Sequence, residues 1–235
     1  MIMSFNSDDP KKDSRKAFSI HFENYVGNEL LKLNSAEYKN DLGQSYNISK
    51  FKYYVSNIRL KNSNGKEFIS NEYFLLNEDD VESKQILLEN VIEGEYTSIS
   101  FTLGVDSLHN CSGIQEGTLD PLNGMFWAWN TGYIFLKLEG RSPESKISGN
   151  FFEYHIGGFK DPVNSIREIT LDFTGSKIKI GEGDNAFIKI KADIEEILKN
   201  PNTIDFSILP SVTDLKNATL IADNYRDMFS ILEVR

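Results

Sequence analysis

The sequence is poor in cysteine, in cationic side chains and in long apolar runs, and each shortage excludes a class of protein. One cysteine among 235 residues cannot form an internal disulfide, so cysteine usage does not report a redox compartment. The 25 basic residues against 35 acidic ones give a formal charge of −10, which makes nucleic acid an unsuitable partner. No apolar run comes near the roughly 18 residues of a membrane-spanning helix, so we expect no transmembrane segment.

Signatures of the commonest enzyme classes are also missing. We find no dinucleotide-binding glycine motif, P-loop, HExxH, GxSxG or CxxC pattern. The first 17 residues lack the apolar core of a signal peptide and are polar, charged and without periodicity, which predicts a disordered leader or tether. We therefore expect a non-catalytic protein with a leader over residues 1–17 and a single domain over residues 18–235.

Short alternating segments separated by turn residues predict an all-β domain. Phe18, Ile20 and Phe22 alternate with polar residues, and Asn64 with Gly65 predicts a tight hairpin between two later strands. Eight or more such strands with frequent turns favour a Greek-key, Ig-like β-sandwich.

Two late segments have helical spacing instead. Asp193 is expected to cap a short helix that stops before Pro201, and Asn217 to cap a second helix over residues 218–229. The predicted sandwich therefore carries one or two short C-terminal helices.

The chain concentrates its unusual residues between positions 101 and 140. This stretch holds both tryptophans, the single cysteine and one of three histidines, and its glycines and prolines predict a long irregular loop between two strands. In an extended backbone Met125, Trp127 and Trp129 share one face, which would line that face with soft aromatic and thioether groups.

Three side chains in and near this stretch are of the type that binds soft metals. His109 and Cys111 are two positions apart, so in an extended backbone they face the same way, and His155 follows on a later strand. Thiolate and imidazole suit monovalent copper or zinc, whereas calcium or magnesium requires oxygen ligands. The sequence thus indicates a candidate metal site built from His155 with His109 or Cys111.

Several long motifs resemble one family. The segments LDPLNGMFWAWNTGYIFLKLEG, YHIGG and KFKYYVSNIRL are similar to those of the MbnP-like family, the methanobactin-associated periplasmic copper-binding proteins and their relatives. The resemblance implies a Cu(I) site of two histidines beside a tryptophan-derived kynurenine that a dihaem enzyme of the cytochrome c peroxidase type installs. It also implies a periplasmic protein or an outer-membrane-anchored lipoprotein.

The family motifs carry over to this chain unevenly. The histidine of the HIGG motif corresponds to His155, and the tryptophans of the MFWAW motif correspond to Trp127 and Trp129. The second family histidine falls at Cys111, with His109 two residues earlier. Either residue is then a substitute ligand, or the metal site is lost.

Two other hypotheses come from different classes. Asp106, Asn110 and Asp120 offer oxygens for a calcium-binding loop, and with an exposed aromatic face they favour a surface module that binds a glycan or a peptide. Asp120 with Glu139 would suit a glycosidase only if a cleft brought them close together. Our first hypothesis is a monomeric, extracytoplasmic copper-binding protein without catalytic activity.

Overall fold

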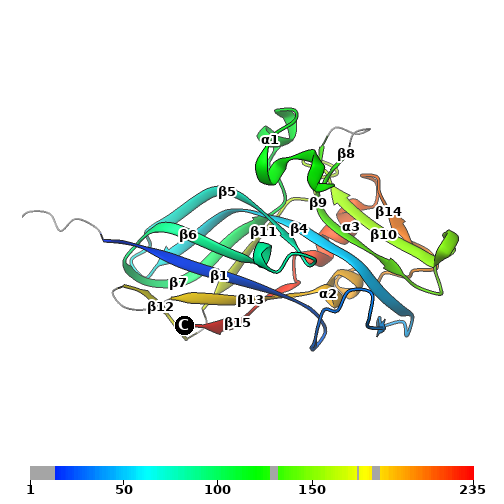
Figure 1. Ribbon diagram of the computed structural model, residues 1–235, viewed down its shortest axis with the longest axis horizontal. Helices are drawn as coiled ribbons and strands as arrows, with labels where there is room; N and C mark the ends of the chain where they lie inside the picture. The colour runs from blue at the N-terminus through cyan, green and yellow to red at the C-terminus, as the bar shows by residue number, and fades with distance from the viewer. Residues whose placement is uncertain (1–13, 128–131, 174, 182–185) are drawn as a thin grey trace, which may run out of the picture.

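The fold consists of two β-sheets packed face to face, with a few short helices outside them (Figure 1). The computed structural model describes residues 14–127, 132–173, 175–181 and 186–235. Residues 1–13 of the expected leader lie outside the described residues, and the first strand already begins at Arg15, three residues before the expected start.

The smaller sheet has five strands within the described residues. They are β1 (Arg15–Val26), β2 (Glu29–Leu30), β6 (Gln85–Ile92), β13 (Phe187–Asp193) and β15 (Phe229–Val234). β1 is central, because β13 pairs with it in parallel on one side and β6 pairs with it antiparallel on the other. β15 closes the sheet beside β13.

The larger sheet has ten strands in the same part of the chain. They are β3 (Tyr38–Lys39), β4 (Ser45–Asn62), β5 (Glu67–Asn77), β7 (Gly94–Leu103), β8 (Phe126–Trp127), β9 (Gly132–Arg141), β10 (Phe151–Gly157), β11 (Arg167–Asp172), β12 (Ile178–Ile180) and β14 (Ser211–Val212). The 18-residue strand β4 organises them, because its first half pairs with β9 and its second half with β5 and β7. The predicted hairpin at Asn64 and Gly65 is confirmed as the β4–β5 turn.

The interior between the sheets is filled by apolar side chains from both. Phe22 of β1, Phe101 of β7 and Phe229 of β15 meet edge to face, with ring centroids 5.0 to 6.2 Å apart. Phe18 and Ile20 are buried with Phe22, so the alternation predicted for this strand is confirmed. Such aromatic contacts dominate core burial and hold the two layers together. The all-β, sandwich-like fold predicted from the sequence is confirmed.

The helices are short and differ in how well the sequence predicted them. α2 (Ile194–Lys199) begins as expected, with the Asp193 carboxylate accepting a 3.1 Å hydrogen bond from the Glu195 N–H. α3 (Ala218–Tyr225) ends four residues before the predicted end, because Phe229 already belongs to β15. No helix of the described residues is long and apolar enough to cross a membrane.

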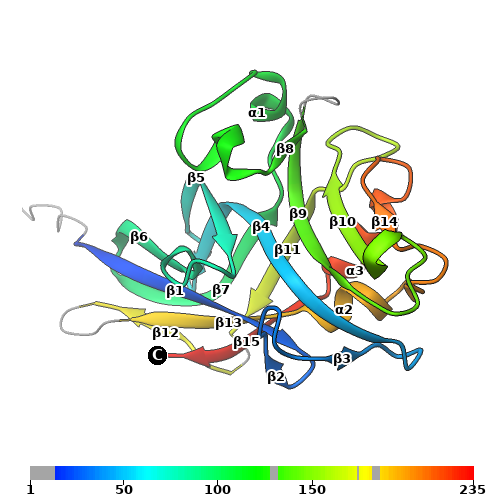
Figure 2. The ribbon, with the colours of Figure 1, turned by 45° about the vertical axis from the view of Figure 1, so that its right-hand side comes forward.

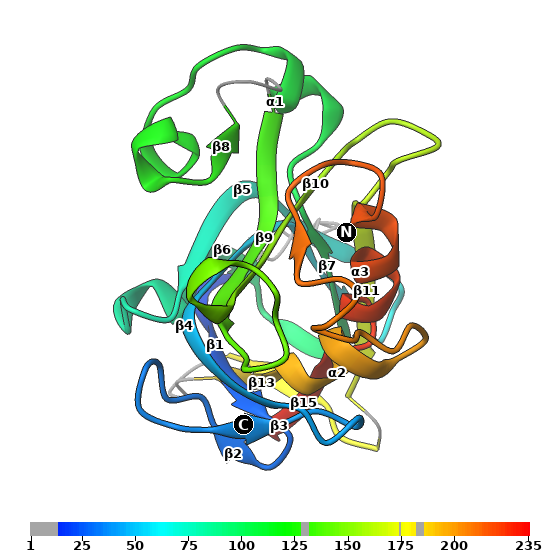
Figure 3. The ribbon, with the colours of Figure 1, turned by 90° about the vertical axis from the view of Figure 1, so that its right-hand side faces the viewer.

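The segment between β7 and β8 projects above the large sheet (Figures 1 and 2). It was expected to be irregular, but it contains helix α1 (Ser107–Cys111) and the single-turn 3-10 helices η2 (Gly117–Leu119) and η3 (Pro121–Asn123). Two further 3-10 turns are η1 (Glu82–Lys84) and η4 (Ser148–Asn150). Figure 3 shows α1 and β8 at one end of the molecule, and α2 next to α3, which packs beside β10.

Candidate functional site

His155 lies on the outer face of β10. Phe152, Tyr154 and Ile156 point into the core, so strand alternation directs the imidazole to the opposite face, where it is half-buried. Its Nε2 donates a 2.8 Å hydrogen bond to Oε1 of Glu139 on the neighbouring strand β9. The imidazole is therefore fixed in orientation by a partner that no motif or spacing in the sequence pairs with it.

Glu139 is itself held from two sides. Its Oε2 accepts a 2.9 Å hydrogen bond from the Lys50 ammonium of β4, so three adjacent strands contribute to one charged cluster. The hydrogen bond from His155, followed by that from Lys50, lowers the pKa of Glu139 to about 2, although burial opposes the shift. A carboxyl group this acidic stays ionised and is unsuited to act as the general acid of a glycosidase.

His109 has a similar arrangement at the upper end of the large sheet. Asp106 caps α1, because its Oδ1 accepts a 2.9 Å hydrogen bond from the His109 N–H, and its Oδ2 lies 3.0 Å from Nδ1 of the imidazole. Tyr73 of β5 donates to the same carboxylate and lies 2.9 Å from Nδ1. Burial alone would raise the pKa of Asp106, but the hydrogen bonds from Tyr73 and His109 outweigh this effect and lower it.

The expectation that His109 and Cys111 share a face is wrong. It assumed an extended backbone, whereas both residues lie on helix α1, where positions two apart point in nearly opposite directions. His109 packs against the ring of Tyr73, with centroids 4.6 Å apart, while Cys111 is exposed to solvent. In the described part of the chain, no three His, Cys, Asp or Glu side chains form a group that could hold a metal ion.

Trp127 and Met125 are both buried. The indole ring of Trp127 lies against Gly157, where a Cβ atom, if one were added, would be 2.7 Å from the ring carbon Cζ3. Gly157 is two residues after His155, so the tertiary structure brings Trp127 to the strand that carries the imidazole. Trp129 lies outside the described residues.

A pocket of about 220 Å³ opens beside Trp127. Its wall comes from α1 through Asn110, from β9 through Tyr133, and from the segment after β10 through Phe159 and Val163. The pocket thus brings together α1, which carries His109 and Cys111, and the segment that follows β10, the strand that carries His155, although none of these three side chains lines it. However, Trp127 is only 5% exposed, so it does not supply the open aromatic surface expected for a glycan-binding module.

The oxygens of the candidate calcium loop accept hydrogen bonds from the loop and from the neighbouring strands. The buried Asn110 side chain donates to the Val105 carbonyl at 2.6 Å and accepts from the Tyr133 N–H at 2.9 Å. Asp120 accepts from the Leu122 N–H at 2.8 Å and caps η3. Together with the capping role of Asp106, these bonds shape the projecting segment and attach it to the sheet.

Fold and site together define an all-β sandwich protein with two carboxylate-paired histidines outside its core. The MbnP family model matches residues 15–214, and the chain belongs to the MbnP family. The structure of MbnP from Methylosinus trichosporium is similar, with a TM-score of 0.60 and 16% sequence identity, over 83% of this chain and 80% of that one. At this identity the likeness shows the shared fold. A comparison with curated proteins gives no match.

Proposed function

We propose that this protein binds copper outside the cytoplasm without catalysing a reaction, using imidazole nitrogens as ligands for Cu(I). The observation that carries the proposal is the common arrangement of His109 and His155. Each imidazole is held through one ring nitrogen by a carboxylate, Asp106 or Glu139. Metal-binding histidines characteristically have such a partner, which fixes the ring and makes the other nitrogen more basic.

The donor chemistry supports a low-coordinate ion. The hydrogen bonds leave Nδ1 of His155 and Nε2 of His109 as the nitrogens that would bind the metal. Cu(I) accepts one or two imidazoles, and the described residues offer no larger group of ligands. Lys50, which lies 2.9 Å from Glu139, balances the charge of that carboxylate, so the cluster offers no net negative charge to favour a divalent over a monovalent cation.

Two finer parts of the proposal follow from family membership. Trp127, buried against the strand of His155, or Trp129 is the tryptophan that a dihaem enzyme of the cytochrome c peroxidase type would oxidise to kynurenine. The site of action would be the periplasm or the periplasmic face of the outer membrane. An intact-mass spectrum of protein purified from its native host tests both, because it reports tryptophan oxidation, export processing and lipidation. An unoxidised, unprocessed chain would contradict these parts.

Competition for Cu(I) against a chromogenic chelator tests the copper site itself. We expect the wild-type protein to take copper from the chelator under reducing conditions, and His155→Ala to weaken binding by about tenfold or more. His21→Ala is the matched control, because His21 lies on β1 and packs against Phe187 with ring centroids 5.5 Å apart. Binding that is equally tight in the wild type, His155→Ala and His109→Ala would refute the proposal.

A further inference from the structure

The sandwich is open along the side where β5 and β6 lie. In the described residues β5 pairs only with β4, and β6 pairs only with β1, so each sheet ends here in a free strand edge. Every second N–H and C=O of such an edge points away from its sheet and is available to another strand. Figure 1 shows the two strands running close to one another on this side of the molecule.

A groove of about 520 Å³ lies between the two edges. Residues 68–72 of β5 and residues 87–90 of β6 line it. Two aliphatic side chains at the groove, Ile69 and Leu87, are 52% and 55% exposed, so the groove presents apolar surface to solvent. The groove therefore combines free backbone groups with accessible apolar surface.

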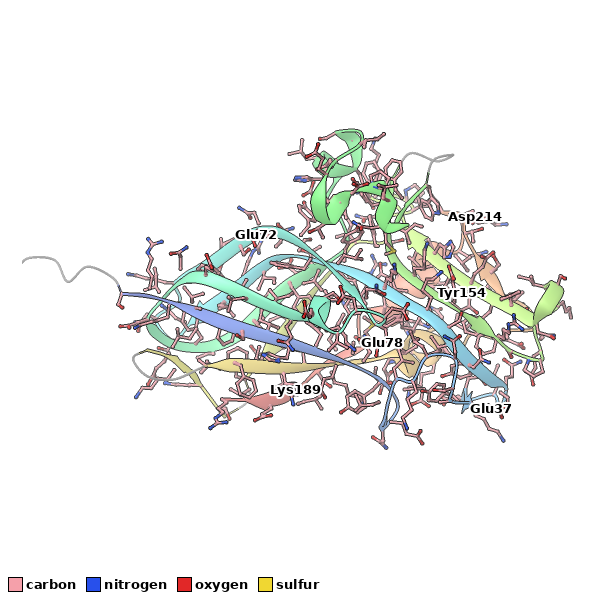
Figure 4. All side chains as sticks on the ribbon, in the orientation of Figure 1. Glu37, Glu72, Glu78, Tyr154, Lys189 and Asp214 are labelled. Atoms are coloured by element: carbon pink, nitrogen blue, oxygen red, sulfur yellow. The ribbon has the colours of Figure 1, made fainter. Side chains whose placement is uncertain are left out.

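Both strands have an irregularity at the groove. Between the pairs Ser56–Tyr73 and Ile58–Ser70, β5 contributes two residues, Asn71 and Glu72, against one from β4. β6 has the same kind of bulge at Glu89 and Asn90, opposite one residue of β1. Because a bulge interrupts pairing and re-aims its side chains, the two bulges present one carboxylate from each strand. Figure 4 marks Glu72 on β5 at the outer surface.

These carboxylates have no cationic partner in the described part of the chain. Glu72, Glu89 and the nearby Glu67 are exposed, and none of them forms a salt bridge with another described residue. Pairing with a second copy of this acidic chain would bring like charges together across the edge, which costs binding energy. The charge of the groove instead complements lysine or arginine.

We propose that this groove binds an extended, basic segment of a partner protein, which adds as a strand to one of the two free edges. Backbone hydrogen bonds to the edge supply the alignment. Alternate side chains of the segment then have different roles: apolar ones cover Ile69 and Leu87, and basic ones pair with Glu72 and Glu89. Neither candidate histidine lines this groove, although Tyr73, next to Glu72 on β5, contacts His109.

Titration with a defined peptide tests the proposal. The probe is a short acetylated and amidated peptide that alternates valine and lysine. We expect the backbone amide NMR signals of residues 67–72 and 87–90 to shift on binding. The double variant Glu72→Lys with Glu89→Lys should bind about tenfold or more weakly, because two exposed charge pairs are reversed. The matched control, Glu29→Lys with Glu116→Lys, makes the same change in net charge at exposed sites elsewhere and should bind as the wild type does.

Several outcomes would overturn the inference. If a valine–glutamate peptide binds as tightly as the valine–lysine peptide, charge has no role in recognition. If the control variant weakens binding as much as the double variant does, only long-range electrostatic attraction is shown. A valine–lysine peptide that is N-methylated on alternate amides keeps its charge but cannot donate hydrogen bonds at those positions. If it binds the wild-type protein as tightly as the unmethylated peptide does, strand addition is excluded. A wild-type dimer disrupted by Glu72→Lys in sedimentation would assign the groove to a second copy.

Discussion

Removing the charge of Glu139 tests whether the histidine cluster stabilises the fold. The substitution Glu139→Gln keeps the size and shape of the side chain but cannot form the charge-assisted bonds to His155 at 2.8 Å and Lys50 at 2.9 Å. Both partners remain in place on neighbouring strands, so the variant isolates the contribution of the carboxylate.

The size of the effect follows from the pKa of Glu139. It lies at about 2 in the folded protein, against an ordinary value of 4.5. A difference of about 2.5 at 1.36 kcal/mol for each pH unit corresponds to about 3 kcal/mol. The side chain is 23% exposed, and water screens the charges, so we expect a loss of about 1–2 kcal/mol at pH 7.

Acidification should remove this difference in a defined range. Because folding lowers the pKa of Glu139, its stabilising contribution is complete above pH 4.5 and is lost as the pH falls through about 2. Urea unfolding of the wild type and Glu139→Gln at pH 7, 4 and 2 therefore should show a gap that closes only at the lowest pH.

Glu153→Gln is the control for this experiment. Glu153 of β10 lies opposite Glu139 of β9 and accepts a 3.2 Å hydrogen bond from Ser211. We expect it to change the free energy of unfolding by less than about 0.5 kcal/mol, because the substituted amide oxygen can still accept the hydrogen bond from Ser211. Equal effects of the two substitutions at pH 7, or a Glu139→Gln gap that persists at pH 2, would refute the role assigned to the cluster.

Two substitutions test the packing around Trp127. Gly157→Ala should destabilise the protein by about 1–3 kcal/mol and shift the tryptophan emission, because its Cβ would lie 2.5 Å from the Tyr133 carbonyl oxygen and 2.7 Å from the indole ring. Gly94→Ala is the control in thermal unfolding, because the atom nearest to its added Cβ would be 4.0 Å away. A loss of stability in this variant as large as that in Gly157→Ala would contradict the steric explanation. Asn110→Ala should lower the free energy of unfolding in urea by about 2 kcal/mol or more, because it leaves the buried Tyr133 N–H without an acceptor. An unchanged urea midpoint would show that this hydrogen bond does not stabilise the fold.

The sequence determined the features that depend on near neighbours. Apolar alternation placed Phe18 and Ile20 in the core, the Asn64–Gly65 pair fixed a hairpin, and Asp193 marked the start of α2. Each depends on contacts within a few residues or on the two-residue period of a strand, so pattern alone was sufficient. The same reasoning failed at Cys111, because an extended backbone was assumed where Asp106 caps a helix.

Only the tertiary structure decided how the two histidines are held. His155 meets Glu139, 16 residues away, and Glu139 meets Lys50, 89 residues away, while His109 meets Tyr73 across 36 residues. These pairs depend on strand order and register, and a shift of one residue in β10 would turn His155 into the core. The sequence therefore identified the two histidines as candidates, whereas their hydrogen-bond partners were decided by the pairing and packing of distant segments.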